Sequence, residues 1–572
     1  MVTASPKHSS KKTTASKVPA AASKPKSSSL PCSKHSVVVE FRPLPSYKGE
    51  FGFDWLRIRE GMPLSPGTLN DPEEGVYIDS ADGHYHGCIE GGAINDASAT
   101  HDMTKKEAKK NIQKEYQRFQ IERRSKNLIL ASLDRVQRGV KYRLLTYFVP
   151  YLNLFPEGTR PAWEGNRRLV NAKNLAQKSG RSQYCLHLSG AHPPAPPCEA
   201  RLQVLIDVKD QAPHAVVLEY NAKYLEISGT RAFSGVSVGA GHPVPSTVSG
   251  KTGKVGRYAL SGHYKLTPET HQESVKKFCE ITIKCIKPIP ENTEITAWAY
   301  DSQGNKAITV PVGKMIVRAN DAAHQKKMKI ALVRVATNVT QKPKKGKKGV
   351  FNAGTALGEV TSLYNTLYQA LIIPDVINTI VMRNASVRDI TLNLSKDPTF
   401  RVPTAADIAA GNNVGKYIDV VSSAKPCINT YASGFAEHLE RGLDKSYPAL
   451  SASYCLAFGF GEDAAASPGA NLMGLAASHV VGGYIVGVRS TVSMYPHRDA
   501  ATLPHELLHT LQLYHTHNDN PTDPAYRLES AQKYIFTHGV TTNIMSYNFR
   551  ASYSTWRWQW KIMWNNADKV VR

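Results

Sequence analysis

The stretch that decides the fold of the C-terminal part of the chain is Thr502-Leu-Pro-His505-Glu506-Leu-Leu-His509-Thr-Leu-Gln512-Leu-Tyr-His515. On an α-helix, His505 and His509 project from the same face, so both imidazoles can reach one ion. Glu506, beside the first histidine, is placed to take a proton from a water molecule, and His515 follows as a third imidazole. Three protein ligands with one open coordination position are typical of a catalytic zinc site. The stretch therefore predicts Zn²⁺ as cofactor and Glu506 as general base.

The residues before the first histidine favour the start of a helix. Thr502 is a candidate N-cap, and Pro504 would fall in the first turn, where a missing N–H costs little. We therefore expect a helix from about residue 502 that carries the first two histidines.

Residues 505–515 resemble the extended zinc signature of the metzincins, HExxHxxGxxH. Later in the chain, Asn543-Ile-Met545-Ser-Tyr547 is similar to the Met-turn of that superfamily. The resemblance implies a zinc metallopeptidase, here a metalloendopeptidase, with an α+β zincin-like catalytic domain. It also implies that Met545 packs beneath the zinc site, and that the phenol of Tyr547 acts in catalysis by approaching the metal or steadying an oxyanion.

One position departs from the signature, because its glycine falls on Gln512. Glycine permits the left-handed turn that brings the third histidine back, whereas a positive φ at glutamine costs roughly 1 kcal/mol. Two other residues could complete the site: His517, or Glu529, whose spacing from His509 resembles that of thermolysin-like zincins. The sequence leaves the third ligand open among His515, Glu529 and His517.

Composition constrains the partners only broadly. The 572 residues include 71 basic and 47 acidic ones, a formal net charge of +24 that favours an anionic partner such as nucleic acid, a membrane face or an acidic wall polymer. Much of the surplus lies in residues 1–39 and in Lys342-Pro-Lys-Lys-Gly-Lys-Lys348, which we interpret as a solvated tail and linker. We expect no specific nucleic-acid partner. The eight cysteines form no CxxC pair and are too sparse for a disulfide scaffold, although one or two bridges stay open.

No targeting or membrane segment is predicted. Residues 1–36 consist mostly of Ser, Lys, Ala, Pro and Thr without an apolar core, unlike a secretory signal peptide. The run 471–488 comes closest to a membrane span, but its glycines and polar residues favour strands over a lipid-facing helix. We expect a soluble chain with no membrane span.

The patterning of apolar residues changes along the chain. After a polar helix expected at 103–122, an alternation with period two predicts strands that turn residues separate at the intervals of a β-sandwich, for example 201–208, 280–286 and 294–300. Further on, strands expected at 329–335, 453–459 and 484–492 alternate with helices expected at 355–373 and 430–445. We predict a multidomain protein whose β-rich N-terminal and middle modules precede an α+β zincin-like domain. Its parts are a disordered basic tail (1–36), an N-terminal α+β module (37–140), one or more β-sandwich-like modules (141–325) and the zinc metallopeptidase domain (326–572).

Further short motifs are Tyr47-Lys-Gly-Glu-Phe-Gly-Phe-Asp-Trp-Leu-Arg57, Tyr147-Phe-Val-Pro-Tyr-Leu-Asn-Leu-Phe155, His515-Thr-His517 and the Trp-rich segment 556–564. The first two look like the leading region of proteins associated with type VI secretion, which are similar over most of the chain, and some of these proteins carry His-Thr-His after the zinc helix and a Trp-rich tail. The resemblance implies an effector or cargo protein, secreted without a classical signal peptide. Such a protein stays in the cytoplasm of the producer before export and is then delivered to a target cell. The implied partners are a spike or tube protein of the secretion apparatus and an immunity protein.

Three functions stay open from the sequence. The first is a zinc endopeptidase that acts on a protein or peptide, and the second is a peptidoglycan peptide hydrolase with the same site. The third is a non-enzymatic component of a secretion machine with a structural zinc, closed by both His515 and His517. The Trp-rich segment, with Trp556, Trp560 and Trp564 on one helix face, is either a packed helix under the active site or an aromatic binding strip.

Overall fold

The computed structural model describes a defined part of the chain. The described residues are 37–54, 65–66, 130–135, 142–146, 150–161, 168–170, 184–189, 193–208, 215–229, 250–252, 255–261, 278–300, 306, 311–339, 352–355, 359–382, 386–411, 414–420, 426–467, 470–481, 484–515, 534–535, 542–546 and 552–572. The predicted tail (1–36), the polar helix at 103–122 and the lysine run at 342–348 lie outside these residues.

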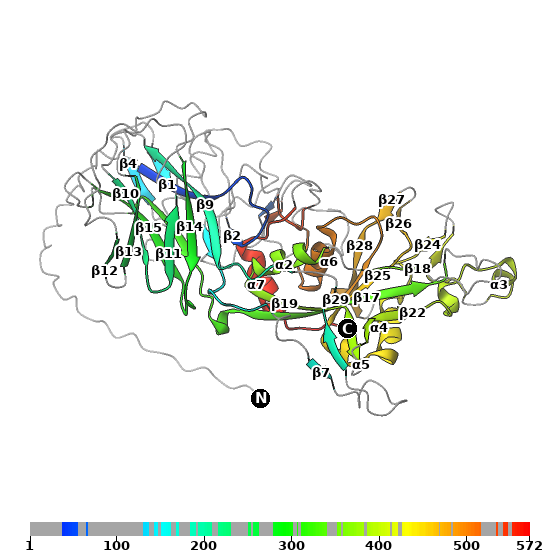
Figure 1. The fold of residues 1–572 in the computed structure, drawn as a ribbon. Helices are drawn as coiled ribbons and strands as arrows, with labels where there is room; N and C mark the ends of the chain where they lie inside the picture. Colours follow the sequence, from blue (N-terminus) through cyan, green and yellow to red (C-terminus); the bar gives the residue numbers. More distant parts are fainter. Residues whose placement is uncertain are drawn as a thin grey trace, which may run out of the picture.

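Two β-sheets of the N-terminal half face each other (Figure 1). The first has the order β1-β9-β14-β11, with β1 (Val37–Pro43), β9 (Glu199–Val208), β14 (Phe278–Cys285) and β11 (Leu225–Gly229). The second has the order β12-β13-β10-β15-β16-β6-β2, with β12 (Gly250–Thr252), β13 (Val255–Ser261), β10 (Ala215–Asn221), β15 (Thr293–Tyr300), β16 (Gly313–Val317), β6 (Tyr151–Asn153) and β2 (Gly52–Asp54). Alternate side chains point between the sheets, where Val39, Leu202 and Ile281 of the first join one cluster with Leu218 and Ile295 of the second. The predicted β-rich character of this part is confirmed.

The third sheet, with the order β18-β17-β25-β29-β28, supports the histidine segment. Its strands are β18 (Asn352–Ala353), β17 (Lys326–Thr337), β25 (Cys455–Gly459), β29 (Tyr484–Met494) and β28 (Gly474–Val481). Strands β17, β25 and β29 are parallel, whereas β28 runs antiparallel to β29 at the edge of the sheet. Strands β19 (Ile372–Ile377) and β22 (Thr391–Asn393) also pair with β17.

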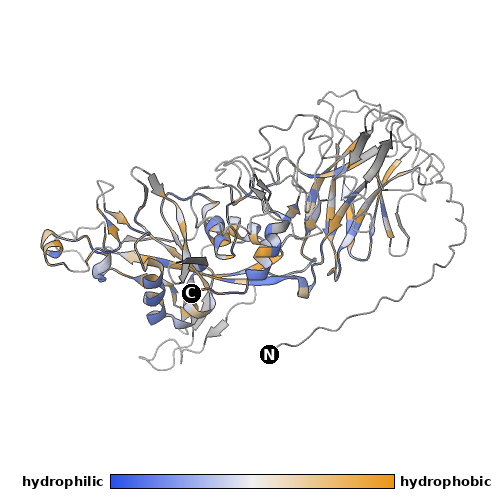
Figure 2. Cartoon of the chain, turned by 180° about the vertical axis from the view of Figure 1, so that it is seen from behind, coloured by the Kyte–Doolittle hydropathy of each residue, from blue (hydrophilic) through white to orange (hydrophobic). Residues whose placement is uncertain are grey.

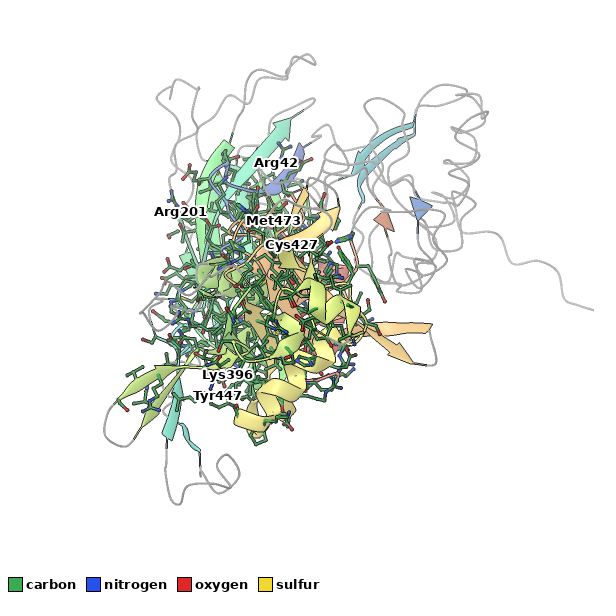
Figure 3. All side chains as sticks on the ribbon, turned by 90° about the vertical axis from the view of Figure 1, so that its right-hand side faces the viewer. Arg42, Arg201, Lys396, Cys427, Tyr447 and Met473 are labelled. Atoms are coloured by element: carbon green, nitrogen blue, oxygen red, sulfur yellow. The ribbon has the colours of Figure 1, made fainter. Side chains whose placement is uncertain are left out.

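Helices cover both faces of this third sheet. Ile330 and Leu332 of β17 belong to the apolar cluster that includes α2 (Val360–Tyr368), α6 (Thr502–Thr510) and α7 (Arg557–Asn566). Ala331 and Val333, on the opposite face, belong to the cluster that includes α4 (Phe435–Ser446) and α5 (Pro448–Ser453). Helix α4 is mostly hydrophilic in Figure 2, and Figure 3 views the molecule from the side of this helix, with Tyr447 at its C-terminal end.

Smaller elements complete the described structure. One sheet has the order β21 (Val387–Asp389), β20 (Thr379–Met382), β8 (Tyr184–His187) and β7 (Arg168–Val170), and another the order β23 (Ile418–Asp419), β24 (Cys427–Ile428), β26 (Ala464–Ser467) and β27 (Ala470–Leu472). The remaining elements are the pairs β3 (Ser65–Pro66) with β30 (Tyr534–Ile535) and β4 (Leu130–Arg135) with β5 (Tyr142–Thr146), the 3₁₀ turns η7 (Ala322–His324) and η8 (Pro398–Phe400), and α3 (Ala405–Ala409).

The buried side chain of Gln369 is one of the contacts that join the β-rich half to the third sheet and its helices. The Gln369 side-chain amide donates to the carbonyls of Gly49 (3.0 Å) and Tyr553 (2.7 Å), and its oxygen accepts from the backbone N–H of Thr555 (2.7 Å). The carbonyl of Gln369 accepts from the side chain of Asn153, at 2.5 Å. Three chain segments that are distant in sequence therefore meet at the residue that follows α2.

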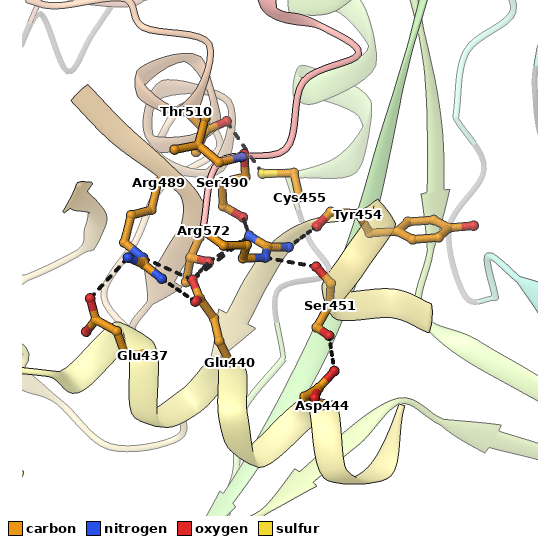
Figure 4. A network of polar contacts seen from close by, with 12 residues as sticks. Glu437, Glu440, Asp444, Ser451, Tyr454, Cys455, Arg489, Ser490, Thr510 and Arg572 are labelled. Atoms are coloured by element: carbon orange, nitrogen blue, oxygen red, sulfur yellow. Dashed lines mark hydrogen bonds and ion pairs between the residues drawn. The ribbon is translucent and has the colours of Figure 1, made fainter. Parts of the chain in front are cut away.

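A network of charged groups fixes α4 to β29 (Figure 4). The Arg489 guanidinium donates to both carboxylate oxygens of Glu440, at 3.2 and 2.5 Å, and Thr491 Oγ1 donates to the same carboxylate at 2.5 Å. The Arg572 guanidinium donates to the carbonyl of Ser490 at 2.7 Å, also in β29. Because Glu440 is buried and accepts three hydrogen bonds, its charge is compensated by direct partners.

The predicted elements of the C-terminal part mostly agree with the structure. The strands expected at 329–335, 453–459 and 484–492 are present as β17, β25 and β29. The helix expected at 355–373 is wrong in its last part, because α2 ends at Tyr368, Leu371 adopts φ +57°, and the following apolar residues form β19 beside β17. The helix expected at 430–445 begins only at Phe435, after Gly434 with φ +78°.

The apolar run 471–488 contributes to three strands, β27, β28 and β29, and so agrees with the interpretation as strands. No helix among the described residues is long and apolar enough to cross a membrane. Taken over those residues, the protein is mostly β, with several sheets and a few short helices.

Candidate metal site

Helix α6 carries two of the predicted ligands and is anchored by its apolar face. Leu503, Leu507 and Leu508 are buried in the same cluster as Trp560 and Met563 of α7. The three leucines lie on one face of α6, and His505 and His509 lie on the other. Burial of the leucines therefore turns both imidazoles away from the apolar cluster. The packed-helix interpretation of the Trp-rich segment is confirmed for Trp560, which is fully buried.

The start of α6 differs from the prediction. Thr502 is the first helical residue and not the N-cap, since Ala501 precedes it in a helical conformation without a side-chain cap. Asp499 provides the capping interactions instead, because its carboxylate accepts from the Ala501 N–H (2.9 Å) and from Thr502 Oγ1 (2.8 Å). Pro504 lies in the first turn, as predicted.

The three predicted imidazoles converge. His515 Nε2 lies 3.1 Å from His505 Nε2 and 3.1 Å from His509 Nε2. One nitrogen from each ring lies within 4.8 Å of the others, and among the described residues these three histidines form the one such group of potential metal ligands. His505 is 7% exposed, and the other two are half-buried. The structure thus brings together the residues that the sequence singled out.

Backbone carbonyls define the protonation of two of these rings. The Nδ1–H of His505 donates to the carbonyl of Ile544 at 2.8 Å, and the Nδ1–H of His509 donates to the carbonyl of Leu513 at 2.7 Å. A carbonyl can only accept, so in the neutral rings each Nε2 carries a lone pair that faces the centre of the group. A proton on His515 Nε2 could form a hydrogen bond to His505 or to His509, but not to both at the same time. A borderline-soft divalent cation such as Zn²⁺ matches three converging imidazole lone pairs with second-shell carbonyls.

The turn after α6 brings His515 back toward the helix. Gln512 adopts φ +65°, the left-handed conformation in which glycine would be unstrained. The Gln512 N–H donates to the carbonyl of His509 (2.8 Å), and the Leu513 N–H donates to that of Leu508 (3.2 Å). This pairing ends the helix in the manner of a left-handed C-cap.

The side chain of Glu506 lies between α6 and the edge strand β28. A Cβ built on Gly474 of β28 would lie only 2.7 Å from Glu506 Cγ, so this close approach requires glycine. Burial raises the pKa of Glu506 to about 8, although a hydrogen bond from the backbone at Ala476 lowers it. A divalent cation held by the neighbouring histidines would favour the ionised carboxylate, which is the form that a general base requires.

His505 and Glu506 line one cleft of about 210 Å³. Three groups of residues form its walls. They are Leu472, Met473 and Gly474 at the junction of β27 and β28, Asp499, Ala501 and Thr502 at the start of α6, and Ile544, Ser546 and Ser552 between α6 and α7. The predicted general base and one predicted ligand therefore share an open space that a substrate could enter.

The segment that resembles a Met-turn packs against α6. Met545 is fully buried in the cluster that contains Leu507, and its N–H donates to Asn543 Oδ1 at 2.9 Å. The side-chain amides of Asn543 and Gln559 of α7 exchange two hydrogen bonds, at 2.7 and 3.1 Å. The carbonyl that orients His505 therefore belongs to a turn held by α7.

One residue near Glu506 was not predicted from the sequence. Tyr431, which follows β24, is 60% exposed. Partial burial of its hydroxyl, together with the neighbouring Glu506 carboxyl, raises the pKa of this tyrosine. Only the tertiary structure brings Tyr431 near Glu506, and its local sequence carries no distinguishing signal.

The other predicted site residues lie outside the described part of the chain. These are the catalytic candidate Tyr547 and the alternative third ligands His517 and Glu529. Of the three alternatives for the third ligand, His515 is the one that the described residues bring into the group.

No model of a known protein family matches the chain, and a comparison with curated proteins also finds no match. The resemblance to the metzincins therefore rests on the motifs of this chain.

Proposed function

We propose that the protein is a zinc-dependent endopeptidase in which His505, His509 and His515 hold Zn²⁺ and Glu506 is the general base. The observation that carries the proposal is the convergence of three imidazole Nε2 atoms, two of them on rings whose Nδ1–H groups donate to backbone carbonyls. Without an ion, the three histidines would leave Nε2 lone pairs facing one another, which is unfavourable.

The cleft supports a catalytic role over a structural one. A zinc ion in this site would polarise a water molecule and lower its pKa to about 7. The Glu506 carboxylate would accept the proton of that water as the water oxygen adds to the peptide carbonyl, and would pass the proton to the nitrogen that leaves when the C–N bond breaks. A structural zinc would need neither a carboxyl beside the ligands nor a cleft that Glu506 and His505 both line.

An extended polypeptide suits this cleft. Among the described strands, β28 lies at the edge of the third sheet, and it packs against Glu506 through Gly474. Free backbone groups at a sheet edge can pair with an extended segment of another chain. We accordingly assign residues 326–572 to a zincin-like catalytic domain, and residues 141–325 to β-sandwich-like modules that precede it.

The substrate class and the route of delivery are part of this proposal. The peptidoglycan alternative uses the same site, so one experiment can test a peptide substrate and a peptidoglycan substrate side by side. The role as a type VI-like secreted effector, with a spike or tube protein and an immunity protein as partners, stays a prediction that rests on the motifs at 47–57 and 147–155.

The decisive variant is Glu506→Ala, assayed with a peptide library and with purified sacculi beside metal analysis. We expect activity to fall by roughly 10²-fold or more, because a positioned general base contributes about 10²–10⁴-fold. Zinc content should stay at the wild-type value, whereas His505→Ala should lose the metal. Glu437→Ala is the matched control, since this glutamate lies on α4, is partly exposed and does not line the cleft.

Equal activity of wild type and Glu506→Ala would contradict the mechanism. Release of muropeptides without cleavage of any protein or peptide would replace the endopeptidase by the peptidoglycan hydrolase. A protein that binds zinc but acts on neither substrate would favour the structural role.

A further inference from the structure

The turn that carries the third histidine is built on a residue that is unfavourable there. Gln512 has φ +65°, and Leu371 is the one other non-glycine residue with positive φ among the described residues. Such a conformation persists in a folded protein when the surrounding structure holds it in place. The contacts of the Gln512 side chain identify what holds it.

The side-chain amide of Gln512 pairs with a single residue of β29 as a backbone peptide would. Its Oε1 accepts from the Val488 N–H at 3.1 Å, and its Nε2 donates to the Val488 carbonyl at 2.9 Å. Val488 lies opposite Ser478 of β28 in a non-hydrogen-bonded pair. The N–H and C=O groups of Val488 therefore point away from β28, toward Gln512. The parallel pairing of β29 with β25 begins only at Thr491. The Gln512 amide therefore extends the sheet beyond the N-terminal end of β25.

The neighbouring residue leaves room for this pairing. A Cβ built on Gly487 would lie 2.8 Å from Gln512 Oε1, so a larger residue would displace the amide. A strand glycine of this kind marks a place where another group approaches the backbone closely. Gly487 and Gln512 thus form a matched pair, although 24 residues separate Val488 and Gln512 in the chain.

We propose that Gln512 is a positioning residue whose amide clamps the turn onto β29 and thereby places His515 at the metal site. The inference rests on the proposed zinc site. We infer in addition that metal binding is coupled to the structure of β29. The turn conformation that places His515 at the metal site is the one in which Gln512 is hydrogen-bonded to Val488. By linkage, a change that loosens the clamp weakens metal binding, and bound metal protects the Val488 amide.

The test measures both ends of this coupling in the full-length protein. Zinc affinity is determined by competition with a chromophoric chelator, and hydrogen exchange of the Val488 amide is followed with and without zinc. The variants are Gln512→Ala, which keeps a Cβ at positive φ, and Gln512→Gly, which removes the clamp but relieves the backbone. Gln325→Ala is the matched control, because the amide of Gln325 also donates to a backbone carbonyl, that of Asn320. These two residues flank η7 and do not lie beside α6.

We expect Gln512→Ala to weaken zinc binding about tenfold, which corresponds to about 1.4 kcal/mol. Gln512→Gly should weaken it about threefold, since glycine adopts the turn without strain but no longer holds it. In the metal-free protein the Val488 amide should exchange at least about tenfold faster in both variants, because its acceptor is gone. Gln325→Ala should match the wild type in both measurements.

Zinc affinity within twofold of the wild type in both Gln512 variants would overturn the inference, as would unchanged exchange at Val488. If Gln512→Ala does not fold, Gln512→Gly decides. Failure of the wild type to bind zinc would refute the proposed function instead, and the exchange of Val488 in metal-free protein would still report whether the clamp exists.

Discussion

Gly474→Ala tests how closely the position of Glu506, the proposed general base, depends on strand β28. The added Cβ would lie 2.7 Å from Glu506 Cγ, 3.2 Å from Glu506 Cδ and 3.0 Å from Thr502 Cγ2. Since carbon atoms in contact are normally separated by about 3.5–4.0 Å, the Glu506 side chain must move by roughly 0.8 Å or more. Both atoms of Glu506 belong to the side chain, so it, rather than the helix backbone, is expected to give way.

A displacement of about 1 Å at a reacting group can cost on the order of 10²-fold in rate. We therefore expect kcat/KM of Gly474→Ala to fall by about 30- to 100-fold, a range set by that principle and the smaller displacement. Zinc content should not change, because no histidine of the metal site lies among the three nearest atoms of the added group. Stability should fall by about 1–3 kcal/mol, as is usual for overpacking.

The assay is steady-state cleavage of the best peptide from the library, beside metal analysis and denaturant unfolding. Gly256→Ala is the control, because its Cβ would lie 2.4 Å from the Tyr220 ring in the second sheet, away from the cleft. This control should lose stability but retain kcat/KM. Wild-type kcat/KM in Gly474→Ala would refute the reasoning, and so would loss of zinc together with activity, since the histidines would then be what moved.

Other predictions concern stability and reactivity. Glu440→Ala should destabilise the protein by about 3–5 kcal/mol in denaturant unfolding, because it leaves the buried Arg489 without its main partner, whereas Glu437→Ala should cost about 0–1 kcal/mol; equal effects would contradict this view of the network. Trp560→Ala should cost about 3–5 kcal/mol, as the ring is fully buried and its Nε1–H donates to Thr555 Oγ1, and a loss below about 1 kcal/mol would argue against the packing of α7. Burial raises the pKa of Cys279 to about 12, so at pH 8 this thiol should resist iodoacetamide in the folded protein and react after denaturation; mass spectrometry of native protein that finds it alkylated would exclude the buried position.

Local spacing was sufficient for the part of the site that lies within one helix. His505, Glu506 and His509 are neighbours on adjacent turns of α6 whatever the rest of the chain does, because a helix repeats every 3.6 residues. The same holds for strands such as β15 and β17, where alternation selects the face that each side chain occupies. A prediction failed where pairing with a distant strand was more favourable than the local helical pattern. The helix expected at 355–373 ends before Leu371, and the residues that follow form β19, which pairs with β17.

The sequence by itself determined the chemistry of the site: two imidazoles and a carboxylate on one helix, with a further histidine close behind. Only the tertiary structure decided that His515 joins them, because the turn at Gln512 is held by a hydrogen-bonded pairing with Val488 that no local rule contains. The same is true of Glu506, whose environment is set by Gly474 and Ala476 of a strand that precedes α6 in the chain. Backbone geometry acts over a few residues and can be read from spacing, whereas the contacts that stabilise an unfavourable turn or desolvate a carboxyl come from segments that meet only when the sheet and its helices pack.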